Sequence, residues 1–255
     1  MRAVAELIPD RGAAASEEEF FRSPPFLEAE GVTHSLHIGA GEAELLAPLI
    51  VREIPGRDER DAISPYGYPG LASRGGVSEI DHARLGSKSD APRAGLVDPA
   101  DVDWSATGLV SIFIRHTLAE PVPLAGAAER NVVQIADPTL PRKSRGSDRN
   151  QINKNRRAGY EVRLAAGPET SPEDRTAFAA AYEQTMRRTA AAERYFFPRP
   201  YFDRLLESPR SWLALVDAPD GTVAAASILV ASDGFLHYYL SGSADSHLHD
   251  SPMKN

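Results

Sequence analysis

Apolar and polar positions alternate most clearly in the second half of the chain. Residues 160–164 (YEVRL) alternate with period two, which predicts a strand. Ser171, Pro172 and Asp174 then supply a helix cap, a first-turn proline and a capping-box acid, so a helix is expected to begin there. One face of that helix carries its larger side chains, at Phe178, Tyr182, Thr185, Met186 and Thr189.

A short helix and three strands are expected next. Residues 200–207 hold aromatic and leucine side chains on one helical side. The strands are predicted at residues 211–216, 222–230 and 235–240, and Asp-Gly turns at 220–221 and 233–234 join them as antiparallel neighbours. Asp250 or Ser251 can cap one more helix, with Pro252 in its first turn.

The first half is less regular. Ser16 and Glu19 form a capping box for a short helix that ends near Phe21. Strands are predicted at residues 34–38, 45–54, 109–115 and 132–136, and irregular chain at 72–97. A helix at 147–158 is closed by Gly159. We therefore expect a mixed α/β protein of two lobes, residues 1–146 and 147–255, with mostly antiparallel sheets.

Composition narrows the class of protein. The 255 residues are 42% hydrophobic and 25% charged, enough for one large or two modest cores. No apolar run approaches the roughly 20 residues of a membrane helix, and the N-terminus lacks a signal sequence, so we expect a cytoplasmic protein without membrane insertion. The absence of cysteine excludes disulfides, thiolate zinc sites and a cysteine nucleophile. The seven histidines lack the partners of a metal site, so no metal is expected.

Charge is distributed unevenly. The net charge is −8, yet residues 142–157 hold seven basic residues and one acid. Two interpretations remain open: a solvated helix face, or a surface that contacts phosphates, such as those of a tRNA acceptor end. The candidate contacts are Arg149, Lys154, Arg156 and Arg157.

Four segments in order carry a resemblance to a known family. They are SPYGYPG (64–70), RNQINKNRRAGYEVRL (149–164), YEQTMRRTAAAERYFFPRPYFDRLL (182–206) and HYYLSGS (237–243) with the following SPMKN. The chain resembles the Fem-type peptidyltransferase branch of the GNAT superfamily. That resemblance implies two GNAT-like lobes that move an acyl or aminoacyl group onto the amine of a peptide, cell-wall precursor or metabolite. Family members continue through further strands, so the resemblance implies an incomplete second lobe whose open edge could pair into a homodimer.

The donor can be judged from one connection. Acyl-CoA enzymes hold a pyrophosphate with a glycine-rich turn at a helix N-terminus. Here residues 244–252 (ADSHLHDSP) contain no glycine and two acids, Asp245 and Asp250. We therefore expect aminoacyl-tRNA as donor and no resident cofactor. Acyl-CoA-dependent N-acetylation stays open as an alternative, as does a non-catalytic binding protein.

Candidate catalytic residues lie in the predicted strand 235–240. Alternation places Tyr239 and His237 on one face with Phe235, and Leu236, Tyr238 and Leu240 on the other. A tyrosine hydroxyl can stabilise an oxyanion or deliver a proton, and the resemblance favours Tyr239. A core tyrosine is the alternative.

Further candidates would bind the amine-bearing peptide or small-molecule acceptor. By resemblance, Arg199 and Tyr201 recognise an acceptor phosphate, and Tyr182 and Arg188 can reach the same cleft. The alternatives are a surface arginine and packing aromatics. Tyr66 and Tyr68 in SPYGYPG would form a wall of the acceptor site, or else belong to a structural turn.

Overall fold

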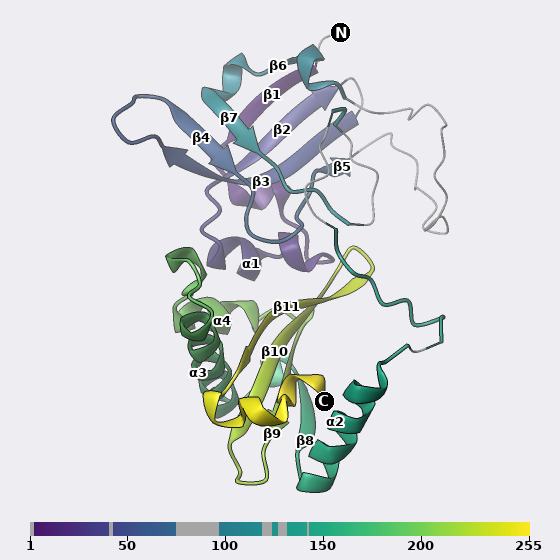
Figure 1. The fold of residues 1–255 in the computed structure, drawn as a ribbon. Coiled ribbons are helices and arrows are strands. Elements are labelled where there is room, and N and C mark those ends of the chain that lie inside the picture. The colour runs from purple at the N-terminus through teal and green to yellow at the C-terminus, as the bar shows by residue number, and fades with distance from the viewer. Residues whose placement is uncertain (1–2, 41–42, 75–96, 119–123, 127–131, 142) are drawn as a thin grey trace. The chain divides into compact units, whose positions relative to one another are not determined.

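The computed structural model describes residues 3–40, 43–74, 97–118, 124–126, 132–141 and 143–255, which divide between two compact units, Met1–Arg130 and Asn131–Asn255 (Figure 1). Both units combine a sheet with helices, and most strand pairs are antiparallel, so the expected mixed α/β class is confirmed. The lobe boundary expected at residue 146 stays a prediction.

The first unit is built on a seven-stranded sheet in the order β6-β1-β2-β3-β4-β7, with β5 paired to β3. Its strands are β1 (Ala3–Ile8), β2 (His34–Ala40), β3 (Ala43–Glu53), β4 (Arg60–Ile63), β5 (Ala72–Arg74), β6 (Val102–Asp103) and β7 (Leu109–Phe113). The pairs β1–β6 and β4–β7 are parallel and the others antiparallel. Leu36, Ile38 and Leu49 lie fully buried in its core.

Three predictions for the first unit were wrong. The helix expected from Ser16 to Phe21 is a 3-10 turn, Phe20–Arg22, and the α-helix α1 (Pro24–Ala29) begins only after Ser23. The strand expected at 132–136 is irregular, because its exposed side chains have no strand beside them among the described residues. Residues 72–74 form β5, whereas 75–96 lie outside the described residues.

The second unit follows the predicted order closely. Its elements are α2 (Gly146–Ala158), β8 (Glu161–Ala166), α3 (Pro172–Arg188), α4 (Arg199–Leu205), β9 (Ser211–Asp217), β10 (Val223–Ser232) and β11 (Phe235–Ser243). The four strands form an antiparallel sheet in the order β11-β10-β9-β8. The Ser171 hydroxyl accepts the Asp174 N–H at 3.0 Å, as the capping pattern predicts, and Gly159 ends α2 at a φ of 94°.

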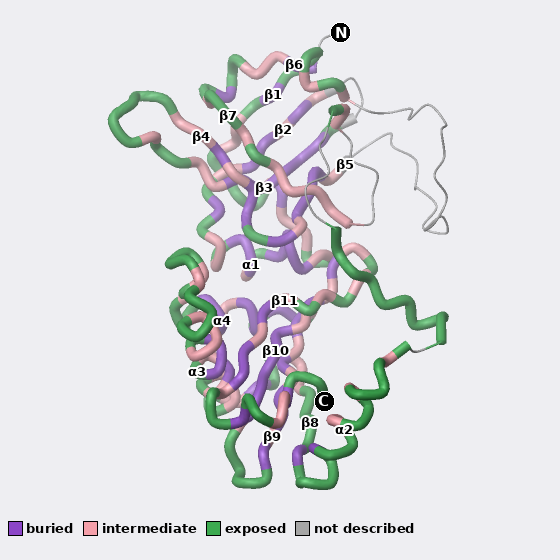
Figure 2. Tube along the Cα trace, viewed as in Figure 1, coloured by how far each residue is buried: buried purple, intermediate pink, exposed green. Residues whose placement is uncertain are grey.

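The core of the second unit lies between α3 and the sheet. Phe178, Leu213, Leu215 and Ile228 are fully buried, and Figure 2 shows the buried residues gathered along β9 and β10. Gly242 in β11 packs against the backbone of α3, where a side chain would not fit. Helix and sheet are therefore in direct backbone contact near the end of β11. None of the described helices is long and apolar enough to cross a membrane.

Candidate functional site

A β-bulge in β11 sets the direction of the predicted catalytic tyrosine. Tyr238 pairs with Leu229 and Leu240 pairs with Ile228, although Leu229 and Ile228 are consecutive. Tyr239 is therefore the extra residue of the bulge. Bulges of this kind redirect side chains and are frequent beside active sites.

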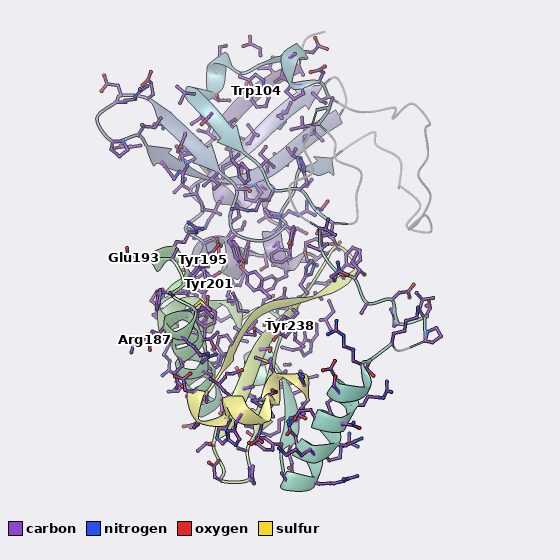
Figure 3. All side chains as sticks on the ribbon, viewed as in Figure 1. Trp104, Arg187, Glu193, Tyr195, Tyr201 and Tyr238 are labelled. Atoms are coloured by element: carbon purple, nitrogen blue, oxygen red, sulfur yellow. The ribbon has the colours of Figure 1, made fainter. Side chains whose placement is uncertain are left out.

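The hydroxyl groups of Tyr239 and Tyr201 lie 3.2 Å apart, within hydrogen-bond distance. Tyr201 comes from α4, and its ring stacks on Phe197 with centroids 4.2 Å apart and planes 10° from parallel (Figure 3). Pro198 and Pro200 at the start of α4 fix the backbone that presents Tyr201. The structure thus brings together one residue predicted to be catalytic and one predicted to bind the acceptor.

The bulge also corrects one predicted face of β11. Leu240 was expected on the face with Tyr238, but cross-strand partners share a face and the partners Ile228 and Leu229 point to opposite sides. Leu240 is buried on the side of Ile228, whereas 59% of Tyr238 is exposed on the other side. Simple alternation was wrong here because the bulge inserts one residue without a partner.

His237 has its contacts within its own hairpin. Its Nε2 lies 3.2 Å from the Ser232 carbonyl oxygen, and its ring meets Phe235 edge-on at 6.2 Å between centroids. The structure gives no contact that joins His237 to the tyrosine pair. Its catalytic role stays a prediction, and the hairpin contact is the observed one.

Tyr182 lies in the aromatic core of the second unit. Only 4% of it is exposed, and its ring meets Phe202 at 5.1 Å and Phe178 at 6.0 Å. Its hydroxyl donates to the Tyr195 carbonyl at 3.0 Å, which holds the segment before α4 against α3. These contacts match the core alternative, and binding by Tyr182 stays a prediction.

The two candidate arginines of this unit have protein partners. Arg199 donates to the Pro172 carbonyl at 3.2 Å and lies 3.6 Å from Asp203, so it joins the first turns of α3 and α4. Arg188 forms an ion pair with Asp245 and donates to Thr185 at 3.1 Å. Both guanidinium groups are partly exposed, and their roles toward an acceptor remain predictions.

The connection after β11 is a 3-10 helix, Asp245–Asp250. The Asp245 N–H donates to Gln184 Oε1 at 2.8 Å, and the Asp245 carboxylate is paired with Arg188. An N–H that an anion would need at this helix start is therefore taken, and a negative charge stands beside it. The helix expected from Ser251 is only a second 3-10 turn, Pro252–Lys254, and Ser251 itself has a left-handed backbone.

A polar cluster near the C-terminus was not anticipated from the sequence. The Tyr160 hydroxyl donates to Asp250 at 2.8 Å and lies 3.1 Å from Nδ1 of the buried His247, whose Nε2 lies 3.0 Å from the Thr222 hydroxyl. Burial and the hydrogen bond to Asp250 raise the pKa of Tyr160 to about 12. The same bond lowers the pKa of Asp250. Asn155 donates to the Asp250 carbonyl at 2.9 Å and thereby ties α2 to this cluster.

The basic residues of α2 differ in their contacts. Arg149 donates to the Ser144 carbonyl, and Lys154 lies 3.5 Å from Asp250. Arg156 and Arg157 are exposed in the last turn. Arg142, at the start of the basic stretch, lies outside the described residues. Phosphate contact by this helix stays a prediction.

The loop SPYGYPG is firmly placed in the first unit. Gly67 has a φ of 128° and lies so close to the Phe21 ring that an added Cβ would be 2.5 Å from it. The Tyr66 N–H donates to Glu30 at 2.7 Å, and Tyr68 meets Phe21 edge-on at 5.8 Å. Tyr66 is 40% exposed. The contacts explain a structural turn, and the acceptor-wall role of both tyrosines remains a prediction.

The comparisons with known proteins bear on the second unit. Residues 142–254 match the family described as Acetyltransferase (GNAT) domain. The matched range contains the Tyr201–Tyr239 pair, the bulge and α2. No curated protein matches the chain. The resemblance of this unit to the GNAT superfamily is therefore supported, and acyl or aminoacyl transfer is its general chemistry.

Proposed function

We propose that the second unit transfers an aminoacyl group onto the amine of a peptide or cell-wall precursor, as Fem-type enzymes do. The observation that carries the proposal is the Tyr201–Tyr239 hydroxyl pair at a strand bulge, inside a range that matches a GNAT domain. Two hydroxyls in contact can accept and release a proton in one event, which is the requirement of acyl transfer to an amine.

The proposed chemistry needs no metal. The amine nitrogen attacks the ester carbonyl of the donor, so that a C–N bond forms and the carbonyl oxygen becomes an oxyanion. Tyr239 donates a hydrogen bond to that oxyanion. The C–O bond then breaks, and the proton lost by the amine reaches the leaving hydroxyl oxygen through the Tyr239 and Tyr201 hydroxyls.

Aminoacyl-tRNA is the proposed donor because the connection after β11 suits a pyrophosphate poorly. The Asp245 N–H is already bound by Gln184, and the Asp245 carboxylate would repel an anion. The basic side chains of α2 supply a surface for tRNA phosphates instead. Such a donor also implies a cytoplasmic reaction.

Parallel labelled donors test the proposal. The protein is incubated with a peptide that has a free lysine amine, and with either a mixture of ¹⁴C-aminoacyl-tRNAs or ¹⁴C-acetyl-CoA. Mild base then hydrolyses remaining esters and leaves amides intact. We expect base-stable label in the peptide from the tRNA donors, and no saturable binding of acetyl-CoA by calorimetry. Transfer from acetyl-CoA with tight binding would instead establish the acyl-CoA alternative.

A homodimer is proposed through β11. Among the described strands of the second unit, β11 is at one edge of the sheet, and its Leu236 and Tyr238 are largely exposed. Light scattering of the chain tests this directly, with a dimer expected. A monomer at micromolar concentration would contradict the pairing.

A further inference from the structure

A pocket lies in the first unit, apart from every residue discussed so far. Its volume is about 490 Å³, within the range of small-molecule sites. Apolar side chains from β7 and the segments around it form much of its wall, namely Leu109, Ile112, Ile114 and Leu124. Trp104, labelled in Figure 3, adds an aromatic surface. The pocket therefore offers a mainly apolar environment.

The charge of the lining limits what the pocket can hold. Among the described residues that form the wall, none is Asp, Glu, Lys or Arg. A charged ligand would lose its hydration without gaining an opposite charge, which costs several kcal/mol. The lining thus favours an uncharged molecule.

His116 is the exception in this apolar wall. Its Nδ1 is buried and has no hydrogen-bond partner within the described chain. Burial lowers the pKa of His116, so the ring is neutral at pH 7, with one nitrogen that donates and one that accepts. A buried polar nitrogen without a partner is unfavourable, and buried polar groups normally have one.

The other polar side chains of the inner wall are already engaged. Trp104 Nε1 donates to the Pro99 carbonyl at 2.9 Å, which fixes the indole ring. The Thr107 hydroxyl donates to the Trp104 carbonyl at 2.8 Å and accepts the Leu109 N–H at 3.2 Å. The exposed Ser111 lies on β7. A ligand in the pocket would therefore find its buried hydrogen-bonding partner at His116.

We propose that this pocket binds an uncharged, mainly apolar small molecule whose hydroxyl or amide group pairs with His116. The apolar wall takes the body of the ligand, Trp104 covers an aromatic or flat portion, and His116 gains the hydrogen bond that the protein does not supply. The site is independent of the transfer reaction proposed for the second unit.

Three probes of the same shape test the proposal: p-cresol, p-xylene and p-toluate, which carry a hydroxyl, a methyl and a carboxylate at one position. The ¹⁵N signal of the Trp104 indole N–H reports binding, and that of Trp212 in the second unit is an internal control. We expect p-cresol to shift the Trp104 signal saturably, with a dissociation constant about five to ten times lower than that of p-xylene, as one added hydrogen bond allows. The carboxylate should bind more weakly than p-cresol.

Variants then assign the preference to one side chain. His116→Phe should make p-cresol and p-xylene bind equally, whereas His34→Phe on β2 should leave the preference unchanged. Equal binding of all three probes, no saturable shift, or an unchanged preference in His116→Phe would overturn the proposal. If His116→Phe does not fold, the three probes with the unaltered chain still decide it.

Discussion

The backbone contact between β11 and α3 makes Gly242 the most sensitive position near the tyrosine pair. A Cβ at Gly242 would lie 2.5 Å from the Ala181 carbonyl oxygen and closer still to Tyr182 N, whereas ordinary contacts begin at 3.4 Å. Strand and helix would have to separate by about 0.9 Å, because backbone atoms cannot rotate away as a side chain can. Overpacking costs about 1–3 kcal/mol, and we expect the upper end of that range for Gly242→Ala.

Urea unfolding measures this cost. With Trp104 replaced by Phe, the fluorescence of Trp212 on β9 reports the second unit alone. Gly146→Ala is the matched control, since its added Cβ would meet nothing closer than 3.9 Å in the first turn of α2. We expect the control to be neutral or stabilising by up to about 1 kcal/mol. A loss below about 0.5 kcal/mol in Gly242→Ala would refute the packing argument, for which surface substitutions set the scale.

Three further changes have defined outcomes. Bonding to Arg163 lowers the pKa of Asp174, so its stabilisation is present above about pH 4 and lost as pH falls through the folded-state pKa; Arg163→Gln should cost about 1 kcal/mol or less at pH 7, given the exposure of Arg163, and progressively less in acid melts, and a pH-independent difference would contradict this. Asn155→Ala removes a buried donor and should cost about 1–2 kcal/mol in urea unfolding, against near zero for the exposed Asn153→Ala; equal costs would count against the α2 anchor. In tRNA titrations, a triple alanine variant should lower the slope of log K against log salt by about one per lost phosphate contact, and an unchanged slope would return the helix to a solvated face; the variant changes Arg149, Lys154 and Arg156.

Local signals explain why the second unit was predicted well. Ser171 and Gly159 act through contacts within a few residues, so their positions alone fix the ends of α3 and α2. The bulge at Tyr239 depends on how β11 pairs with β10, and two adjacent tyrosines in an apolar run do not reveal it. The partner of Tyr239 could not be predicted either, because Tyr201 is 38 residues away in the chain.

The first unit shows the limit of the pattern. Residues 132–136 are rich in β-branched side chains, yet Val132 is 88% exposed and belongs to no strand. A strand forms only where another strand supplies its hydrogen bonds, and single-sequence alternation does not contain that information. The pocket at His116 escaped notice for the same reason, since Trp104, His116 and Leu124 come together only in the fold.

The rate of amide formation in a Tyr239→Phe variant tests the central claim most directly. The substitution removes one hydroxyl and keeps the ring, and Tyr238→Phe on the opposite, exposed face is the matched control. We expect kcat for transfer from aminoacyl-tRNA to fall about 10²-fold or more in Tyr239→Phe, as for loss of an acid–base group or oxyanion donor, and to stay within about twofold in Tyr238→Phe. Equal rates in the two variants would contradict a catalytic role of the Tyr201–Tyr239 pair.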